Sequence, residues 1–247
     1  MRMKKRLDQL LVERGLIKSR TKAAAAIKDS AVLVDGCVIT KPAEQVTENA
    51  EITLVKNVCP YVSRGGLKLE GAIKAFNINF AGKTVLDLGS STGGFTDCAI
   101  KHGAKKVIAV DVGSGQLDES LRADARVVCR ENTDIRALDE KTIKAADIIV
   151  ADISFVSLAK VLGGVINAAE NQEFVLLIKP QFEAEPTLIK KHKGVIKDRL
   201  LSEKIAKQAA ERLVGLGLCL LGFLESPIKG GDGNTEYITY FVKNTRG

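Results

Sequence analysis

Short apolar runs alternate with helical stretches through most of the chain after residue 80. The runs are TVLDL, KVIAVD, RVVC, DIIVAD and FVLLIK. Strands that alternate with helices predict a parallel sheet covered by helices on both faces. Two later runs, CLLGFLES and EYITYFV, are separated only by a loop and are expected to pair antiparallel at one edge of the sheet. A helix from Ser63 is expected to precede the first strand.

Aspartates mark the ends of three of these strands. Asp87, Asp111 and Asp152 lie at or just after the carboxyl ends, where an open α/β sheet binds its ligand. The loop GSSTGG (residues 89–94) follows the first strand. It lacks the middle glycine of a dinucleotide-binding GxGxxG, and no Walker A lysine follows it. Phosphate cradling is therefore disfavoured, and so is an NAD-linked oxidoreductase.

The aspartates suit a different ligand. Asp111 ends the second strand, where its carboxylate can accept protons from both hydroxyls of a ribose. Asp87, just before the loop, suits a ligand that carries an ammonium group. A ribose and an amino acid without a pyrophosphate describe S-adenosylmethionine. The alternative is that these aspartates only cap helices.

The N-terminal residues carry the charge of the chain. Residues 1–28 hold nine Lys and Arg against two acidic residues, which gives +7, equal to the formal net charge of the whole protein. Two short helices and a hairpin turn at Asp35-Gly36 are predicted in this region. A localised basic block favours a polyanionic partner, and a solvated basic face is the alternative. A linker at residues 56–61 divides the chain into domains 1–60 and 61–247.

Composition excludes several classes of protein. No run approaches the roughly 20 apolar residues of a membrane helix, and the N-terminus lacks the apolar region of a signal peptide. The five cysteines form no CxxC pair, which indicates reduced thiols and a cytoplasmic protein. Neither of the two histidines has metal-ligand company, so no metal is predicted. The sequence carries no signal for oligomeric state.

The N-terminal stretch RLDQLLVERGLIKSRTKAAAAIKDSAVLVDGCVITKP resembles an S4 RNA-binding domain. The resemblance implies a small α+β domain that contacts RNA. The basic residues that we expect to contact RNA are Arg6, Arg20, Lys22 and Lys28 in this domain and Arg64 after the linker.

The rest of the chain carries a second set of motifs. LDLGSSTGGFTD, AVDVGSGQL, VADISFVSL, IKPQFE and NTEYITYF resemble the TlyA (haemolysin A-like) methyltransferases, relatives of the FtsJ-type RNA ribose methyltransferases. The resemblance implies a Rossmann-like class I methyltransferase fold, S-adenosylmethionine as methyl donor, and 2′-O-methylation of cytidines in ribosomal RNA. The positions that it matches to the donor site are Gly89, Ser90, Gly93, Gly94, Phe95, Asp111 and Asp134, the last near the adenine. Asp97 is expected to be structural.

The family's K-D-K-E tetrad matches Lys68, Asp152, Lys179 and Glu236. A lysine accepts a hydroxyl proton only in its neutral form, against a reference pKa of about 10.4. Lys179 ends an apolar strand, and Pro180 after it favours extended geometry, so its side chain is expected at the ligand edge. We expect Lys179 to accept the proton and Asp152 to orient it, with Lys68 and Glu236 completing the charge network.

Motifs that the sequence lacks indicate the methyl acceptor and weigh against other functions. The segment after Asp152 is not the (D/N)PPY of amino-group methyltransferases, and no cysteine pair suits C5 methylation, so a hydroxyl is the expected acceptor. A membrane-damaging haemolysin would need an insertion segment that the sequence lacks. A catalytically inactive RNA-binding protein is disfavoured by the intact tetrad. The basic segment LIKKHKGVIKDR (188–199) is either a mobile RNA-binding loop or a solvated loop.

Overall fold

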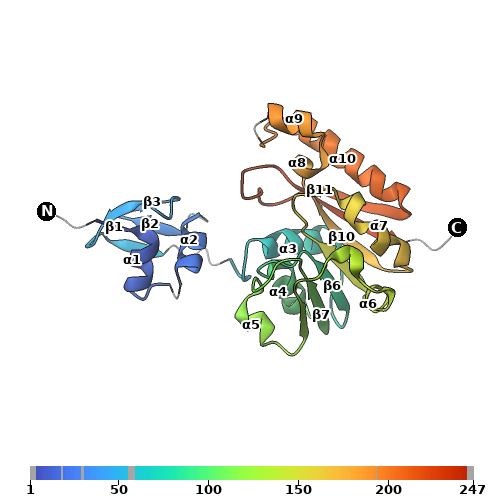
Figure 1. Cartoon of the computed structure of the whole chain (residues 1–247), viewed down its shortest axis with the longest axis horizontal. Coiled ribbons are helices and arrows are strands. Elements are labelled where there is room, and N and C mark those ends of the chain that lie inside the picture. The colour runs from blue at the N-terminus through green and yellow to red at the C-terminus, as the bar shows by residue number, and fades with distance from the viewer. Residues whose placement is uncertain (1–3, 18, 29–30, 55–58, 193, 244–247) are drawn as a thin grey trace. The chain divides into compact units, whose positions relative to one another are not determined.

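The computed structural model describes residues 4–17, 19–28, 31–54, 59–192 and 194–243. The chain divides into two compact units, Met1–Val58 and Cys59–Gly247 (Figure 1). The division falls within the linker predicted at residues 56–61, of which residues 56–58 lie outside the described residues. Each unit has its own hydrophobic core.

The N-terminal unit packs two short helices against small sheets. Its helices are α1 (Leu7–Glu13) and α2 (Arg20–Lys28). Its strands are β1 (Lys4–Arg6), β2 (Val32–Val34), β3 (Cys37–Val38), β4 (Gln45–Thr47) and β5 (Ile52–Leu54). Asp35 and Gly36 both have positive φ, 49° and 77°, as a two-residue type I′ turn requires. Leu7 and Leu11, one turn apart on α1, and Ile27 of α2 are fully buried in the core.

The second unit is built on one seven-stranded sheet with the order β11-β12-β10-β9-β6-β7-β8. Its strands are β6 (Thr84–Leu88), β7 (Lys106–Val110), β8 (Val127–Arg130), β9 (Ile148–Ala151), β10 (Glu173–Ile178), β11 (Leu218–Glu225) and β12 (Tyr237–Lys243). The strands from β10 to β8 are parallel. The predicted antiparallel edge is confirmed: β12 pairs antiparallel with both β10 and β11.

Helices cover both faces of this sheet, as predicted (Figure 1). The helices are α3 (Gly65–Phe76), α4 (Gly94–Lys101), α5 (Glu119–Arg122), η1 (Ile135–Ala137), α6 (Glu140–Lys144), α7 (Leu158–Ala168), α8 (Pro180–Glu183), α9 (Pro186–Lys191) and α10 (Arg199–Gly215). On one face α3 and α4 bury Leu69 and Cys98 against Val85 and Val175. On the other, α7 and α10 bury Leu162 against the sheet.

The connections leave β6 in one direction, toward β7 and β8, and leave β9 in the other, toward β10. The carboxyl ends of β6 and β9 therefore flank the switch point at which an open α/β sheet binds its ligand. Among the described residues, no helix is long and apolar enough to cross a membrane.

Candidate active site

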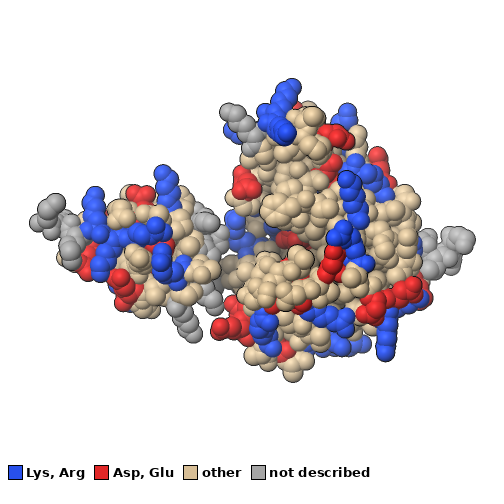
Figure 2. Space-filling view, in the orientation of Figure 1, with Lys and Arg blue, Asp and Glu red and all other residues tan. Residues whose placement is uncertain are grey.

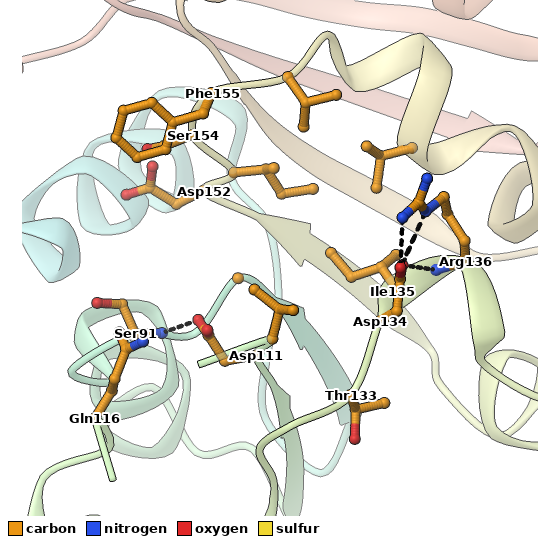
Figure 3. A pocket seen from close by; sticks show the side chains of 15 residues that line it. Ser91, Asp111, Gln116, Thr133, Asp134, Ile135, Arg136, Asp152, Ser154 and Phe155 are labelled. Carbon is orange, nitrogen blue, oxygen red and sulfur yellow. Dashed lines mark hydrogen bonds and ion pairs between the residues drawn. The ribbon is translucent and has the colours of Figure 1, made fainter. Parts of the chain in front are cut away.

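A cavity of about 490 Å³ opens at the switch point, beyond the ends of β6, β7 and β9 (Figure 3). Loops that follow β6, β7, β8 and β9 form its walls together with Val161 of α7, and the lining includes both apolar side chains and the carboxylates of Asp111, Asp134 and Asp152. The lining residues are Gly89, Ser91, Asp111, Val112, Gln116, Thr133, Asp134, Ile135, Arg136, Asp152, Ile153, Ser154, Phe155, Val156 and Val161.

The glycine-rich loop reaches the cavity through Gly89 and Ser91. Gly89 has φ +78°, and a Cβ there would lie 3.2 Å from the carbonyl oxygen of Asp152. A side chain at residue 89 would therefore be strained in its backbone and would crowd β9. Ser91 also has positive φ, 47°, which turns the loop between Ser90, which is buried, and the cavity wall.

The other predicted loop residues lie behind the cavity wall. Ser90, Gly93, Gly94 and Phe95 are not among its lining residues. Phe95 is 4% exposed and packs in the core beneath α3. A Cβ on Gly94 would overlap Ser63 Oγ and come within 2.9 Å of the backbone nitrogen of Gly66. Gly94 and Phe95 thus pack on α3, whereas a Cβ on Gly93 would overlap Leu117 and Leu121.

Asp111 lines the cavity with a carboxylate that two backbone amides hold in place. Its Oδ2 accepts the N–H of Ser91 at 2.8 Å and its Oδ1 accepts the N–H of Gly113 at 2.7 Å. Each carboxylate oxygen has further acceptor capacity. Asp111 is therefore fixed in position and can still accept hydrogen bonds from a vicinal diol.

Asp134 and Arg136 form an ion pair on the cavity wall (Figure 3). The guanidinium lies 2.6 Å from Asp134 Oδ2, and the Arg136 N–H donates to Oδ1 at 2.9 Å. Arg136 lowers the pKa of the Asp134 carboxyl to about 2, chiefly through the side-chain hydrogen bond. A ligand amino group at this position would share the carboxylate with Arg136.

Asp87 is fully buried on β6 and does not line the cavity. The hydroxyl of Thr96 donates to its Oδ2 at 2.6 Å, and none of the residues that the structure describes donates a hydrogen bond to its Oδ1. Burial raises the pKa of Asp87 to about 7, and the nearby charges of Asp152 and Asp111 add to the rise. An orphaned buried acceptor of this kind is rare in native structures and fits a site that takes a cation.

Four charged residues meet beside the cavity, from elements far apart in the sequence. Lys179 Nζ, after β10, lies 2.6 Å from Asp152 Oδ1, after β9. Lys68 Nζ, on α3, lies 2.7 Å from Glu236 Oε2, just before β12, and 3.6 Å from Asp152 Oδ2. Lys68, Lys179 and Glu236 are each less than 9% exposed. The predicted tetrad thus forms one connected cluster, and only Asp152 of the four lines the cavity.

Lys179 also contacts residues that the sequence motifs did not single out. Its Nζ donates to Ser154 Oγ at 2.7 Å and lies 6.0 Å from the centre of the Phe182 ring. The Phe155 ring packs at 5.1 Å from that of Phe182, yet Phe155 is 89% exposed and has φ +70°. A strained, exposed aromatic residue beside a charge cluster is a candidate for substrate contact.

Glu131 organises the loop that follows β7. Its carboxylate accepts the N–H groups of Gly115, Gln116 and Leu117 at 2.7, 2.8 and 3.0 Å. Arg122 lies 2.6 Å away and lowers the pKa of Glu131 to about 2, together with these amides. Gln116 lines the cavity, so Glu131 positions one wall of it. In the sequence alone, Glu131 is only an acidic residue three positions before Asp134.

The predicted RNA-contacting residues are partly engaged with acids. Arg6 and Arg20 lie 2.9 and 3.2 Å from Asp8 Oδ2, and they lower the pKa of Asp8 to about 2. Both arginines keep a large exposed fraction. The side chains of Lys22 and Lys28 lie outside the described residues.

Two further residues lie near the start of α3. Arg64 is exposed at the start of the helix. Asp97 accepts the N–H of Val62 at 2.8 Å and pairs with Lys101 at 2.9 Å. These contacts are consistent with the structural role expected of Asp97.

The fold and the site together are those of an α/β methyltransferase domain: a largely parallel sheet with an antiparallel edge, a cavity at the switch point, and a carboxylate that two backbone amides hold after the second of its strands. The chain belongs to the FtsJ-like methyltransferase family, whose model matches residues 61–243. An S4 domain model matches residues 5–52. The family resemblance inferred from the sequence motifs is confirmed.

Named relatives match nearly the whole chain. Hemolysin A of Brachyspira hyodysenteriae is 42% identical over 96% of this chain and 99% of its own length. The 16S/23S rRNA (cytidine-2′-O)-methyltransferase TlyA of Mycobacterium tuberculosis is 42% identical over 97% of this chain and 90% of its own length. The solved structure of a candidate hemolysin from Streptococcus thermophilus is 34% identical with a TM-score of 0.76, and covers 99% of this chain and 90% of its own.

Proposed function

We propose that this chain transfers a methyl group from S-adenosylmethionine to the 2′-hydroxyl of cytidines in ribosomal RNA. The observation that carries the proposal is the cluster that the buried Lys68, Lys179 and Glu236 form with Asp152 beside the cavity. The name of the M. tuberculosis relative, a cytidine-2′-O-methyltransferase that acts on ribosomal RNA, supports this acceptor.

The residues of the cavity fit S-adenosylmethionine. Asp111 has free acceptor capacity for the ribose hydroxyls, and Ile135 and Val156 offer an apolar surface to the adenine. Asp134 can accept from the adenine amino group. Asp87 has the spare acceptor that an ammonium group requires. Because Asp87 does not line the cavity, contact between its carboxylate and the ammonium group of the donor requires the loop at Gly89 to move.

When bound, the donor supplies an electrophilic methyl group, and the chain supplies alignment and a proton acceptor. Lys179 accepts the proton of the ribose hydroxyl at Nζ, which Asp152 Oδ1 and Ser154 Oγ hold at 2.6 and 2.7 Å. Glu236 lies 2.7 Å from Lys68 Nζ, which in turn lies 3.6 Å from Asp152 Oδ2.

A hydroxyl acceptor is also favoured by the state of the cysteines. Methylation at a pyrimidine carbon uses a thiolate nucleophile. Cys98 is fully buried, and burial raises the pKa of its thiol to about 12. No cysteine lines the cavity.

The N-terminal unit, as an S4 domain, would hold the RNA through Arg6, Arg20 and neighbouring lysines. These positions and Arg64 stay predictions of RNA contact. A ribosomal substrate further implies a cytoplasmic enzyme.

The test is transfer of labelled methyl from S-adenosylmethionine to purified ribosomal subunits and to deproteinised ribosomal RNA. The wild type is compared with Lys179→Ala and with Lys105→Ala, a matched control at an exposed lysine before β7. We expect Lys179→Ala to lower kcat by about 10²–10⁴-fold with donor affinity retained, and 2′-O-methylcytidine to be the labelled nucleoside. Absence of incorporation by the wild type, or label on a base, would refute the proposal.

A further inference from the structure

A basic segment follows α8, the short helix that begins directly after Lys179. It comprises residues 186–192 and 194–199, which include α9 and the turn that enters α10. Lys190, Lys191 and Lys197 are exposed. In the part of the chain that the structure describes, no carboxylate lies within ion-pair distance of their ammonium groups. Arg199, by contrast, pairs with Glu225 at 2.8 Å.

These unpaired cations form a surface suited to a polyanion. Lys and Arg side chains project from the surface over α9 (Figure 2). An ammonium group without an internal partner keeps its full charge for a phosphate, and each phosphate contact of this kind releases a counterion. The exposure of three such lysines within eight residues therefore favours a phosphate backbone as partner.

Asn234 fastens the basic segment to the neighbouring loop. It is 2% exposed. Its Oδ1 accepts the N–H of Ile196 at 3.0 Å, and its Nδ2 donates to the carbonyl of Gly194 at 3.0 Å. The side-chain amide thus satisfies a backbone donor and a backbone acceptor of the basic segment at once, as a neighbouring strand would.

The loop that carries Asn234 also carries Glu236. The N–H of Gly230 donates to the carbonyl of Asn234 at 2.9 Å, which closes a tight turn. A Cβ on Gly230 would overlap Oε1 of Glu236, so the turn packs directly on that carboxylate. The carbonyl of Glu236 accepts the N–H of Ser226 at 2.8 Å. The position of Asn234 therefore helps to set the position of Glu236.

The opposite side of the loop rests on α3. A Cβ on Gly71 of α3 would lie 3.0 Å from Pro227 Cγ, and Lys68, one turn earlier, pairs with Glu236 at 2.7 Å. The basic segment, the Asn234 loop and α3 thus pack in sequence from the surface to the charge cluster.

We propose that the basic segment binds RNA phosphates and that Asn234 is a positioning residue, which transmits the docked position of the segment to Glu236 and so to Lys68. The inference rests on the proposed function and adds to it a second RNA contact within the catalytic unit. The lysines act on RNA affinity, and Asn234 acts on the chemical step.

The first test removes the charges. Full-length Lys190→Ala/Lys191→Ala/Lys197→Ala is compared with Lys83→Ala/Lys105→Ala/Lys106→Ala, which removes the same charge at the amino ends of β6 and β7, away from the cavity. Binding of a fixed RNA hairpin transcript is measured against salt. We expect only the first variant to raise the RNA KM, and its salt slope to fall by about 2–3 units. Equal slopes for the two variants would refute the phosphate contact.

The second test removes the side-chain amide of Asn234. We expect Asn234→Ala to lower kcat by at least about tenfold while its RNA KM and donor affinity stay near those of the wild type and its Tm falls by only a few degrees, because two backbone groups lose their partners. Asn234→Asp keeps the acceptor for Ile196 but places an acceptor against the Gly194 carbonyl, so it should behave like Asn234→Ala. An unchanged kcat, or a loss of donor affinity together with Tm, would refute transmission through Asn234.

The two levels of failure are distinguishable. If the wild type transfers no methyl group to any ribosomal RNA or subunit, the proposed function fails, whatever the variants do. If the wild type is active and the two triple variants have the same RNA KM and salt slope, the inference fails and the proposed function stands.

Discussion

Replacing Asp87 with asparagine tests the cost of burying an ionised carboxylate in the site. The carboxyl is fully buried, its Oδ1 has no partner among the described residues, and burial raises its pKa from 3.8 to about 7. Above pH 7 the folded chain must hold an ionised carboxylate with one hydroxyl donor, from Thr96. Asp87→Asn removes the charge and nearly preserves the shape.

The size of the effect follows from the shift in the pKa of Asp87. A rise of about 3 units corresponds to about 4 kcal/mol. Because the folded pKa of this acid is raised, the folded chain holds more protons than the unfolded chain between about pH 4 and pH 7. The free energy of unfolding contributed by Asp87 therefore falls across this window, by up to about 4 kcal/mol, and is level above it.

The assay is urea denaturation of both proteins from about pH 4 to about pH 8. We expect the free energies of unfolding to be similar near pH 4, and Asp87→Asn to be more stable by a few kcal/mol at pH 8. The difference between the two curves cancels the titration of other groups. A gap that stays constant across this pH range would refute the account of Asp87 as a strained carboxylate.

Donor binding should show the opposite dependence. An ammonium group needs the ionised form of Asp87, so affinity for S-adenosylmethionine should fall about tenfold for each pH unit below 7, and Asp87→Asn should bind it weakly at every pH. Methylthioadenosine, which lacks the amino acid, is the matched ligand. Its affinity should be indifferent to pH and to the substitution.

Three other substitutions test residues that line the cavity or support its loops. Glu131→Gln removes a charged acceptor of three amides and should weaken donor binding about tenfold without changing RNA affinity; equal donor affinity by calorimetry would contradict this. Gly94→Ala crowds the start of α3 and should cost about 1–3 kcal/mol of unfolding free energy, whereas Gly163→Ala, in open space on α7, should be neutral or stabilising. Phe155→Ala should lower kcat/KM for RNA about 5- to 150-fold if its exposed ring stacks on a base, and Leu221→Ala, exposed on β11, should not.

The fold could be predicted because its strands are buried on both faces. Runs such as VLLI in β10 are apolar throughout, as strands of a covered parallel sheet must be. The position of β12 between β10 and β11 was not readable, since the apolar pattern of a strand does not name its neighbours. The short helices α8 and α9 were not predicted either, because each is stabilised by its surroundings rather than by its own periodicity.

The candidate site residues at strand ends could be predicted from the sequence, whereas the arrangement of the loop residues could be predicted less well. Asp111 and Asp152 end strands, so the topology alone brings them to one edge. Ser90 and Ser91 are adjacent and chemically identical, yet one is buried and the other lines the cavity. The difference comes from the positive φ of Ser91, which the sequence does not encode in any single residue type. Glu131 was missed because its role depends on three amides that a folded loop aligns.

The charges of Lys68, Asp152, Lys179 and Glu236 explain why these four residues occur together. Two lysines and two carboxylates balance in charge, and each lysine has one short partner, Asp152 for Lys179 and Glu236 for Lys68. Burying ions of this kind adds little stability, whereas removing one partner leaves an uncompensated charge. In the proposed reaction the ribose hydroxyl gives its proton to Lys179, and the carboxylate of Asp152 at 2.6 Å balances the ammonium group that results. We therefore expect each of the other three residues to act on that step through its charge.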